Sequence, residues 1–136
     1  MKRLILIIFG GLFSVVSIAQ SKSQIIDEKI TSVTTYEQRL DKGIKDKYVI
    51  EISKYDSFGR LIELKEIARK GEIKLWKKYI FDANGNLIEE VFLDLEGKID
   101  KRELTHYNGN LRIYKEYFDS KGRMYKKKSY EYEFQK

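Results

Sequence analysis

The sequence has 136 residues, 27 Lys and Arg against 21 Asp and Glu, and neither Cys nor Pro. This length suits a single domain. The absence of Cys excludes disulfides and thiolate metal sites, so burial and strand pairing must hold the fold together. The formal net charge of +6 is spread among many acidic residues. It suits an anionic surface or polymer without requiring one, and nucleic acid is not an expected partner.

Residues 1–19 have the pattern of a secretory signal peptide. Lys2 and Arg3 give a positive start, residues 4–18 are almost wholly apolar or small, and Ala19 precedes Gln20 at the expected cleavage site. The apolar run is about 15 residues, whereas a membrane-spanning helix needs roughly 20, so cleavage is favoured over retention and no stable membrane span is expected afterwards.

A Gln directly after the cleavage site resembles exported proteins of Gram-negative bacteria, and with no Cys the lipid anchor of a lipoprotein is excluded. The expected location is therefore the periplasm or the exterior of such a cell. Residues 20–28 are expected to form a flexible leader and residues 29–136 a repeat-built β-domain.

Glycines divide this domain at near-constant steps of 12 to 16 residues, which indicates an internal repeat. Each lies in a polar segment between β-prone runs, where a tight hairpin requires a positive φ. They are Gly43, Gly59, Gly71, Gly85, Gly97, Gly109 and Gly122.

The runs between these turns predict eight strands. Their expected bounds are 29–40, 44–55, 60–68, 72–81, 86–93, 98–107, 111–118 and 123–134. Short connections join antiparallel neighbours, so the predicted fold class is all-β: an eight-stranded antiparallel up-and-down meander. Charges on both faces favour an open or incompletely closed sheet over a closed barrel. A helix over 25–40 is the alternative for the first strand.

Four of the turns carry the pattern Asp-x-x-Gly, which is typical of a type I turn followed by a left-handed Gly, with the Asp side chain capping the turn. Asn108-Gly109 is an Asn-Gly pair, the strongest short hairpin signal. The residues to which the sequence assigns this structural role are Asp56, Gly59, Asp82, Gly85, Gly97, Gly109, Asp119 and Gly122.

Extending the strands from these turns predicts a register and two unequal faces. Trp76 is expected to face Phe92, and Lys78, Glu90 and Arg102 to form a ladder of charges. In the next hairpins, the same reasoning predicts that Ile88 faces Leu104, Tyr117 faces Tyr125 and Glu116 faces Lys126. The core side is expected to carry Ile73, Leu75, Tyr79, Phe81, Leu87, Val91, Leu93, Ile99 and Tyr107.

The turn motifs resemble the YD repeats of Rhs-type proteins. The residues Tyr55-Asp56-Ser57-Phe58-Gly59-Arg60-Leu61 carry the closest match, and the turns at Asp82 and Asp119 repeat it with Phe in place of Tyr. Tyr107-Asn108-Gly109-Asn110-Leu111 is more similar to MORN-like antitoxin repeats. The resemblance covers about residue 48 to the end. It implies a strand–turn unit and a role in binding or surface interaction, with no catalytic residue.

Residues able to carry out chemistry are few. His106 is the only histidine and is better explained as a strand residue than as a general base. Glu89 and Glu103 are expected to lie opposite each other, which a glycosidase would need, although a sheet rim or a register error explains the pair more simply. The Asp82–Asn86 segment lacks the spacing of a calcium loop. No catalytic residue, metal site or cofactor is predicted.

The predicted ligand contacts are Trp76, Phe92, Lys78 and Arg102, because aromatic side chains on a solvated face suit sugar or peptide stacking. Lys126, Lys127 and Lys128 make the last strand basic. Lysines there either protect the sheet edge or form a binding surface, and edge protection is the simpler reading.

The sequence thus predicts an exported, non-enzymatic binding module that recognises a glycan, peptide or protein partner through a β-sheet face. The alternative is an envelope-interaction or immunity protein that resembles antitoxins. A small hydrolase is the third possibility.

Overall fold

The computed structural model of the protein describes residues 21–43 and 46–135. The predicted signal peptide lies outside the described residues. The elements are α1 (Lys22–Asp27), β1 (Ser32–Glu37), the 3-10 helix η1 (Leu40–Lys42), β2 (Tyr48–Tyr55), β3 (Leu61–Ile67), β4 (Ile73–Phe81), β5 (Leu87–Leu93), β6 (Ile99–Asn108), β7 (Leu111–Phe118) and β8 (Met124–Ser129).

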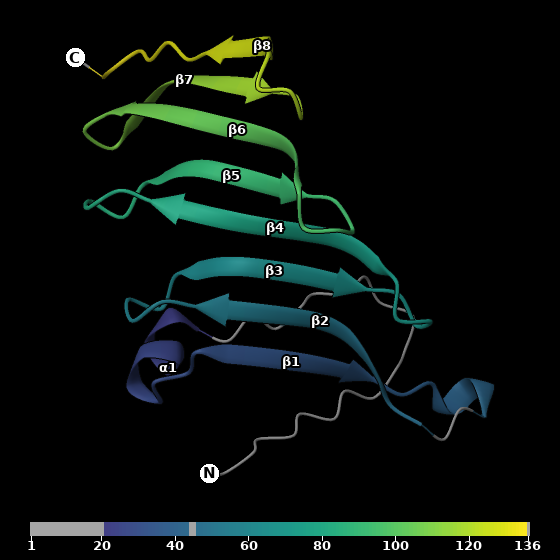
Figure 1. Ribbon diagram of the computed structural model, residues 1–136. Helices are drawn as coiled ribbons and strands as arrows, with labels where there is room; N and C mark the ends of the chain where they lie inside the picture. The colour runs from purple at the N-terminus through teal and green to yellow at the C-terminus, as the bar shows by residue number, and fades with distance from the viewer. Residues whose placement is uncertain (1–20, 44–45, 136) are drawn as a thin grey trace.

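The eight strands form one antiparallel sheet in which each strand pairs with the next in sequence (Figure 1). The sheet does not close, because β1 and β8 lie at its opposite edges. The predicted fold class is therefore confirmed in its strand number, its meander topology and its open form. Short hairpin turns of the expected kind connect the strands from β2 onward.

The Asp side chain of each motif caps its own turn. Asp56 Oδ1 accepts hydrogen bonds from the amides of Phe58 and Arg60 at 2.9 and 3.0 Å, and the amide of Gly59 donates to the Asp56 carbonyl. Gly59 adopts a φ of +69°, a conformation that costs a glycine little. The same bonds recur at the turns that begin with Asp82, Asp94 and Asp119.

The aromatic and the Leu of the motif form the first cross-strand pair of the hairpin. Tyr55 pairs with Leu61, Phe81 with Leu87, and Phe118 with Met124. Aromatic–aliphatic pairs of this kind stabilise antiparallel strands. The motif therefore supplies both the turn and the contact that closes it.

A β-bulge follows the first or the second pair from the turn in every hairpin, and it makes the predicted register wrong farther along the strands. Phe92 pairs with Lys77 instead of Trp76, and Val91, not Glu90, lies between Lys78 and Arg102. Leu104 likewise pairs with Glu89, Tyr117 with Lys126, and Glu116 with Lys127. One extra residue in a strand shifts all later pairs by one position.

The extra residue always lies on the second strand of its hairpin. From the pairs on either side of each register shift, these residues are Ile50, Ile62, Lys74, Ile88, Asp100, Ile113 and Tyr125. Because β1 is the first strand of the first hairpin, it has no bulge.

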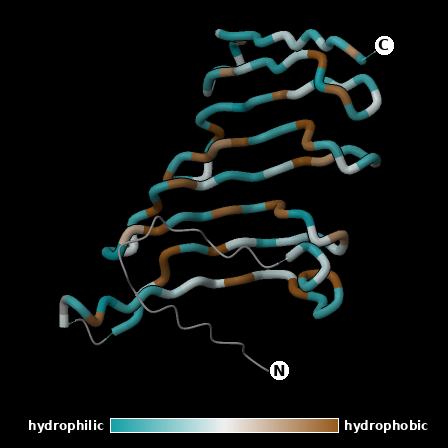
Figure 2. Tube along the Cα trace, turned by 180° about the vertical axis from the view of Figure 1, so that it is seen from behind, coloured by the Kyte–Doolittle hydropathy of each residue, from teal (hydrophilic) through white to brown (hydrophobic). Residues whose placement is uncertain are grey.

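Burial is divided between the two faces of the sheet instead of defining one core. Among the described residues the buried hydrophobic side chains are Ile25, Val91 and Tyr117. Val91 pairs with Arg102 and Tyr117 with Glu103, neighbours on β6 whose side chains point to opposite faces. The predicted single core side is therefore wrong, and hydrophobic and hydrophilic segments alternate along the strands (Figure 2).

Helix α1 lies in the segment for which a flexible leader was expected. The Ser21 side chain caps it by accepting from the Gln24 amide. Ile25 is 1% exposed, and α1 packs so closely on the β2–β3 turn that a Cβ added to Gly59 would lie 2.9 Å from Ile26.

Candidate functional site

The register assigns each strand residue to one of two faces, since side chains alternate along a strand and paired residues share a side. The tryptophan face carries Lys65, Trp76, Lys78, Ile80, Glu89, Val91, Arg102 and Leu104. The lysine–glutamate face carries Lys77, Tyr79, Glu90, Phe92, Lys101, Glu103, Lys115 and Tyr117.

A network of ion pairs spans four strands of the lysine–glutamate face. Lys115 Nζ lies 2.9 Å from Glu90 Oε2 and 2.6 Å from Glu103 Oε2. Lys77 Nζ lies 2.7 Å from Glu90 Oε1. These four side chains are only 14–17% exposed, so water screens their attraction less than it would at a fully exposed surface.

The network keeps Glu90 and Lys115 charged. Burial acts to raise the pKa of Glu90, but hydrogen bonds from Lys77 and Lys115 outweigh it and lower that pKa. Burial acts to lower the pKa of Lys115, but its bonds to Glu103 and Glu90 outweigh it and raise that pKa. An opposite charge within hydrogen-bond distance favours the ionised form of each group.

Two carboxylates do face each other, but they are Glu90 and Glu103 instead of the predicted Glu89 and Glu103. Lys115 lies between them and binds both. A glycosidase requires one carboxyl that keeps its proton at working pH, whereas the pKa of Glu90 is lowered. This arrangement suits a structural salt-bridge network better than an acid–base pair.

Aromatic rings of this face lie beneath lysine ammonium groups. Lys101 Nζ is 3.9 Å and Lys77 Nζ 4.5 Å from the Phe92 ring centroid. Lys126 Nζ is 4.1 Å from that of Tyr117. Such cation–π contacts cover the ring faces. A partner that approaches Phe92 would therefore meet the lysine side chains before the ring.

Trp76 on the opposite face is held from several sides. Its Nε1 donates to Glu63 Oε1 at 3.0 Å, and Lys65 Nζ lies 3.8 Å from the ring centroid. The far edge of the ring lies against the β5–β6 turn, where a Cβ added to Gly97 would be 3.2 Å from it. The indole is fixed in one orientation but remains partly exposed.

Three of the four predicted ligand contacts share the tryptophan face. Lys78 pairs with Val91 and Val91 with Arg102, so the two cations lie in one row across β4, β5 and β6, with Trp76 two residues along β4. Lys78 is exposed. Arg102 is 41% exposed and its Nε lies 2.6 Å from Glu89 Oε1. Phe92 is on the other face, so its expected contact with Trp76 is absent.

His106 on β6 stacks on one residue of β7 and hydrogen-bonds to another. Its ring lies 4.1 Å from that of Tyr114, and its Nε2 is 3.1 Å from Glu116 Oε2. Lys127 Nζ approaches the same carboxylate at 3.8 Å. These contacts hold the histidine side chain against Tyr114 and Glu116 of the neighbouring strand.

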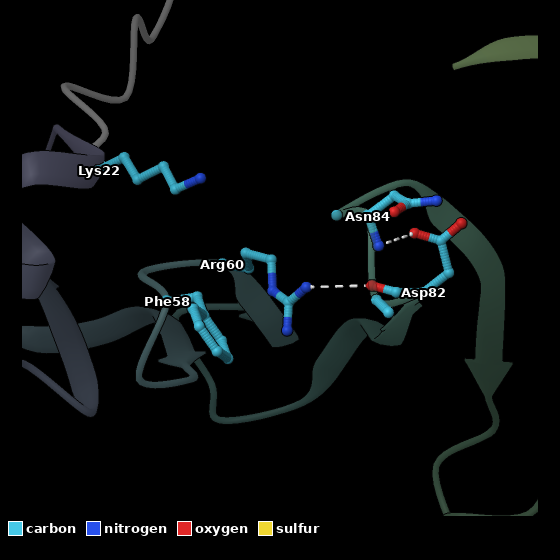
Figure 3. A pocket seen from close by; sticks show the side chains of 7 residues that line it. Lys22, Phe58, Arg60, Asp82 and Asn84 are labelled. Carbon is cyan, nitrogen blue, oxygen red and sulfur yellow. Dashed lines mark hydrogen bonds between the residues drawn. The ribbon is translucent and has the colours of Figure 1, made fainter. Parts of the chain in front are cut away.

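A hollow of about 420 Å³ lies between α1 and two neighbouring turns. Figure 3 shows Lys22 and Phe58 on one side of it and Asn84 on the other. Arg60 crosses between the turns: its Nε binds Asp56 Oδ2 at 2.7 Å and its Nη1 the Asp82 carbonyl at 3.4 Å. The guanidinium is already engaged by the protein, so the hollow is better described as the seam between two repeats.

The lysines of β8 point to both faces. Lys126 lies over the Tyr117 ring and Lys127 over the Tyr114 ring, the latter at 3.8 Å. All residues of β8 are exposed. The strand is therefore a basic edge with aromatic support on each side.

Sequence reasoning missed Lys77, Lys115 and Tyr117 as a connected group. The sequence did contain a signal: Glu90 and Phe92 are two residues apart, as are Lys77 and Tyr79 on the neighbouring strand. Phe92 pairs with Lys77, and Glu90 with Tyr79, only if Ile88 is an extra, bulged residue.

No group of three or more His, Asp or Glu side chains is placed to hold a metal ion within the part of the chain that the structure describes. Over the same residues, no helix is long and apolar enough to cross a membrane.

The fold and its faces define an all-β protein built as one open sheet of hairpin repeats. No protein-family model, curated protein or solved structure matches the chain.

Proposed function

We propose that this chain is an exported, non-enzymatic binding module whose tryptophan face recognises a polymeric partner: a peptide segment, a protein surface or a glycan. The observation that carries the proposal is the row Lys78–Val91–Arg102 beside the oriented Trp76 on a sheet face that no second layer of described residues covers.

The shape of the face favours an extended partner. Small molecules bind in concave pockets that bury most of their surface. Two hollows among the described residues, which Arg60 and Arg69 help to line, are open and lie at turns and strand ends instead of on the centre of the face. A flat sheet face suits a partner that spreads its contacts over several strands.

The chemistry of the face combines apolar and cationic contacts. Ile80, 44% exposed, follows Lys78 by two residues on β4 and so shares its face. Lys78 is free to extend towards a carboxylate or sulfate, while the lysine-supported indole of Trp76 offers one edge for stacking. Tryptophan, tyrosine and arginine are the side chains that contribute most at protein interfaces, and this face carries Trp76 and Arg102.

Binding is tested with Lys78→Glu, a change at an exposed side chain that should leave the fold intact. The purified protein and the variant are compared on a glycan array and in pull-downs from envelope fractions. The proposal expects that Lys78→Glu weakens the captured interaction at least about tenfold. The matched control is Lys101→Glu on the lysine–glutamate face, which should change it little.

Trp76→Ala is a second variant, accompanied by a melting curve because the indole is packed. A glycan partner predicts a loss of array signal in a folded Trp76→Ala protein. A protein partner predicts loss from the pull-down alone. Equal binding by all face variants would exclude the tryptophan face.

Export is tested separately. The full chain with a C-terminal tag is expressed in a Gram-negative host, and the cells are fractionated. The proposal expects a periplasmic or secreted product whose N-terminus, determined by sequencing, begins near Gln20. A cytoplasmic product that keeps Met1 would refute it.

A further inference from the structure

The two edges of the sheet differ in chemistry and in regularity. β8 carries Lys126, Lys127 and Lys128 and contains a bulge at Tyr125. Charged residues and bulges are the devices by which proteins prevent one sheet edge from pairing with another. β1 at the opposite edge has the sequence Ser-Val-Thr-Thr-Tyr-Glu. It contains no bulge, and its one charged residue is Glu37 at its end.

Among the residues that the structure describes, β1 has a hydrogen-bonded strand neighbour on one side only. The Thr31 carbonyl accepts from the Tyr55 amide, so Thr31 points its backbone groups towards β2. Because these directions alternate along an antiparallel strand, Val33 also points inward while Ser32 and Thr34 point outward. The outer row of amides and carbonyls is regular, since the adjacent bulge lies on β2 at Ile50.

This outer row is complementary to a second copy of itself. In an antiparallel pair, outward-pointing residues must face outward-pointing residues, and the two-fold arrangement with Thr34 opposite Thr34 is the one that pairs all three outward residues of β1, Ser32, Thr34 and Tyr36. Val33 then faces Thr35 of the second copy and Ser32 faces Tyr36. Pairs of Thr with Thr stabilise sheets, Val33 and Thr35 are β-branched residues that favour strands, and no like charges are opposed within β1.

Charge also favours this arrangement over the others. Pairing β8 with β8 would oppose lysines, and pairing β8 with β1 would leave open edges that add further copies without limit. β1 and β8 lie at opposite edges of the sheet (Figure 1), so pairing β1 with β1 leaves the two basic β8 edges at the far ends of a continuous sheet. It also covers Tyr36, which is 48% exposed.

We infer that the β1 edge is an interaction surface for a second copy of this chain, which pairs antiparallel about Thr34 and doubles the sheet. Both faces of each copy stay open, so this inference goes beyond the proposed recognition of a partner by the tryptophan face and does not depend on it. It would place two identical tryptophan faces in one assembly.

The test is sedimentation velocity of the purified full chain over a concentration series, with Thr34→Pro and a charge pair as variants. Proline at Thr34 removes an outward amide that β2 does not use, and an edge strand tolerates this. The inference expects a monomer–dimer equilibrium for the unchanged protein and a monomer for folded Thr34→Pro.

Thr34→Lys and Thr34→Glu test the register itself, and they keep the inference falsifiable if the proline variant fails to fold. Each alone should dimerise several-fold more weakly than the unchanged protein, because like charges would face each other. An equal mixture of the two should recover the dimer. Ser129→Lys on the β8 edge is the matched control and should leave the dimer unchanged.

A monomer at every concentration of the unchanged protein would overturn the inference. A dimer that persists in folded Thr34→Pro would also overturn it. The same holds if Thr34→Lys and Thr34→Glu each dimerise alone as strongly as their mixture does. Either of the last two results would place the contact elsewhere on the molecule.

Discussion

Glu90 and Glu103 lie directly opposite each other on β5 and β6, and Lys115 binds both carboxylates at 2.9 and 2.6 Å. We expect Lys115→Met to lower the free energy of unfolding by roughly 1–3 kcal/mol, because it leaves two half-buried carboxylates opposed without the cation that they share. Urea denaturation monitored by Trp76 fluorescence measures the loss.

Two variants sharpen this prediction. Glu103→Gln in the Lys115→Met protein should recover part of the lost stability, because it removes one of the opposed charges. Lys101→Met is the control: Lys101 is 39% exposed and lies 3.9 Å from Glu103, so its loss should cost little. Equal effects of Lys101→Met and Lys115→Met would contradict the prediction.

The sequence was enough to predict the order of the elements. The Asp-x-x-Gly spacing located the turns, and the short connections required a meander. It was not enough to predict which side chains meet, because nothing in a run such as Leu87–Leu93 marks Ile88 as a bulge. A bulge depends on backbone pairing with the neighbouring strand, so Trp76 and Phe92 were placed together although they lie on opposite faces.

The core was mispredicted for a related reason. A strand whose alternate residues are apolar predicts one buried face, but a single-layer sheet buries residues only by contact with neighbouring strands. Val91 and Tyr117 are each covered by long side chains on their own face: Val91 pairs with Lys78 and Arg102, and Lys126 lies over Tyr117. Lysine and arginine stems cover apolar surface in this way.

Stability should depend on pH mainly on the acid side. The pKa of Asp82 is lowered by hydrogen bonds from the Asn86 amide and side chain, and that of Glu90 is lowered by its lysine partners despite burial. Groups with lowered pKa stabilise the fold fully above their ordinary values, 3.8 for Asp and 4.5 for Glu, and lose that contribution as the pH falls through the lowered values.

Lys115 gives the opposite sign at high pH. Its raised pKa supplies stability that is complete below the ordinary lysine value of 10.5 and is lost only as the pH rises beyond it. Urea midpoints should therefore be level from about pH 6 to 9 and fall below about pH 4.5. Glu90→Gln should reduce the acid loss, and a midpoint that rises on acidification would refute the assignment.

The turn glycines allow a matched test of how α1 is held. Gly59 and Gly85 occupy equivalent positions with φ of +69° and +83°, so alanine at either should cost about 1 kcal/mol through backbone strain. At Gly59 the new methyl would also lie 2.9 Å from Ile26 and from the Lys22 carbonyl, whereas Gly85 has open space.

We therefore expect Gly59→Ala to destabilise the protein more than Gly85→Ala and to detach α1. Limited proteolysis should cut between Lys22 and Lys29 in Gly59→Ala while sparing Gly85→Ala. If both variants resist cleavage equally, the close packing of α1 on the turn is not what holds the helix.

The residue after the turn glycine links its own turn to the next turn at the same end of the strands. Asn86 Nδ2 donates to Asp82 Oδ2 within its own turn at 3.0 Å and to the Gly109 carbonyl of the following turn at 3.1 Å. Arg60 makes the equivalent link to the Asp82 carbonyl. Asn86→Ala should cost about 1 kcal/mol, the usual net value of such bonds.

Lys98 provides the control for this link. It occupies the same position in the β5–β6 turn, but its side chain binds Glu96, and both are at least 70% exposed. Lys98→Ala should thus leave the urea midpoint almost unchanged, because its amide still donates to Asp94. Asn86→Arg places at position 86 the residue type that the equivalent position 60 carries, and it should retain more stability than Asn86→Ala. If it retains less, the link between turns depends on the asparagine amide and is not general to the repeat.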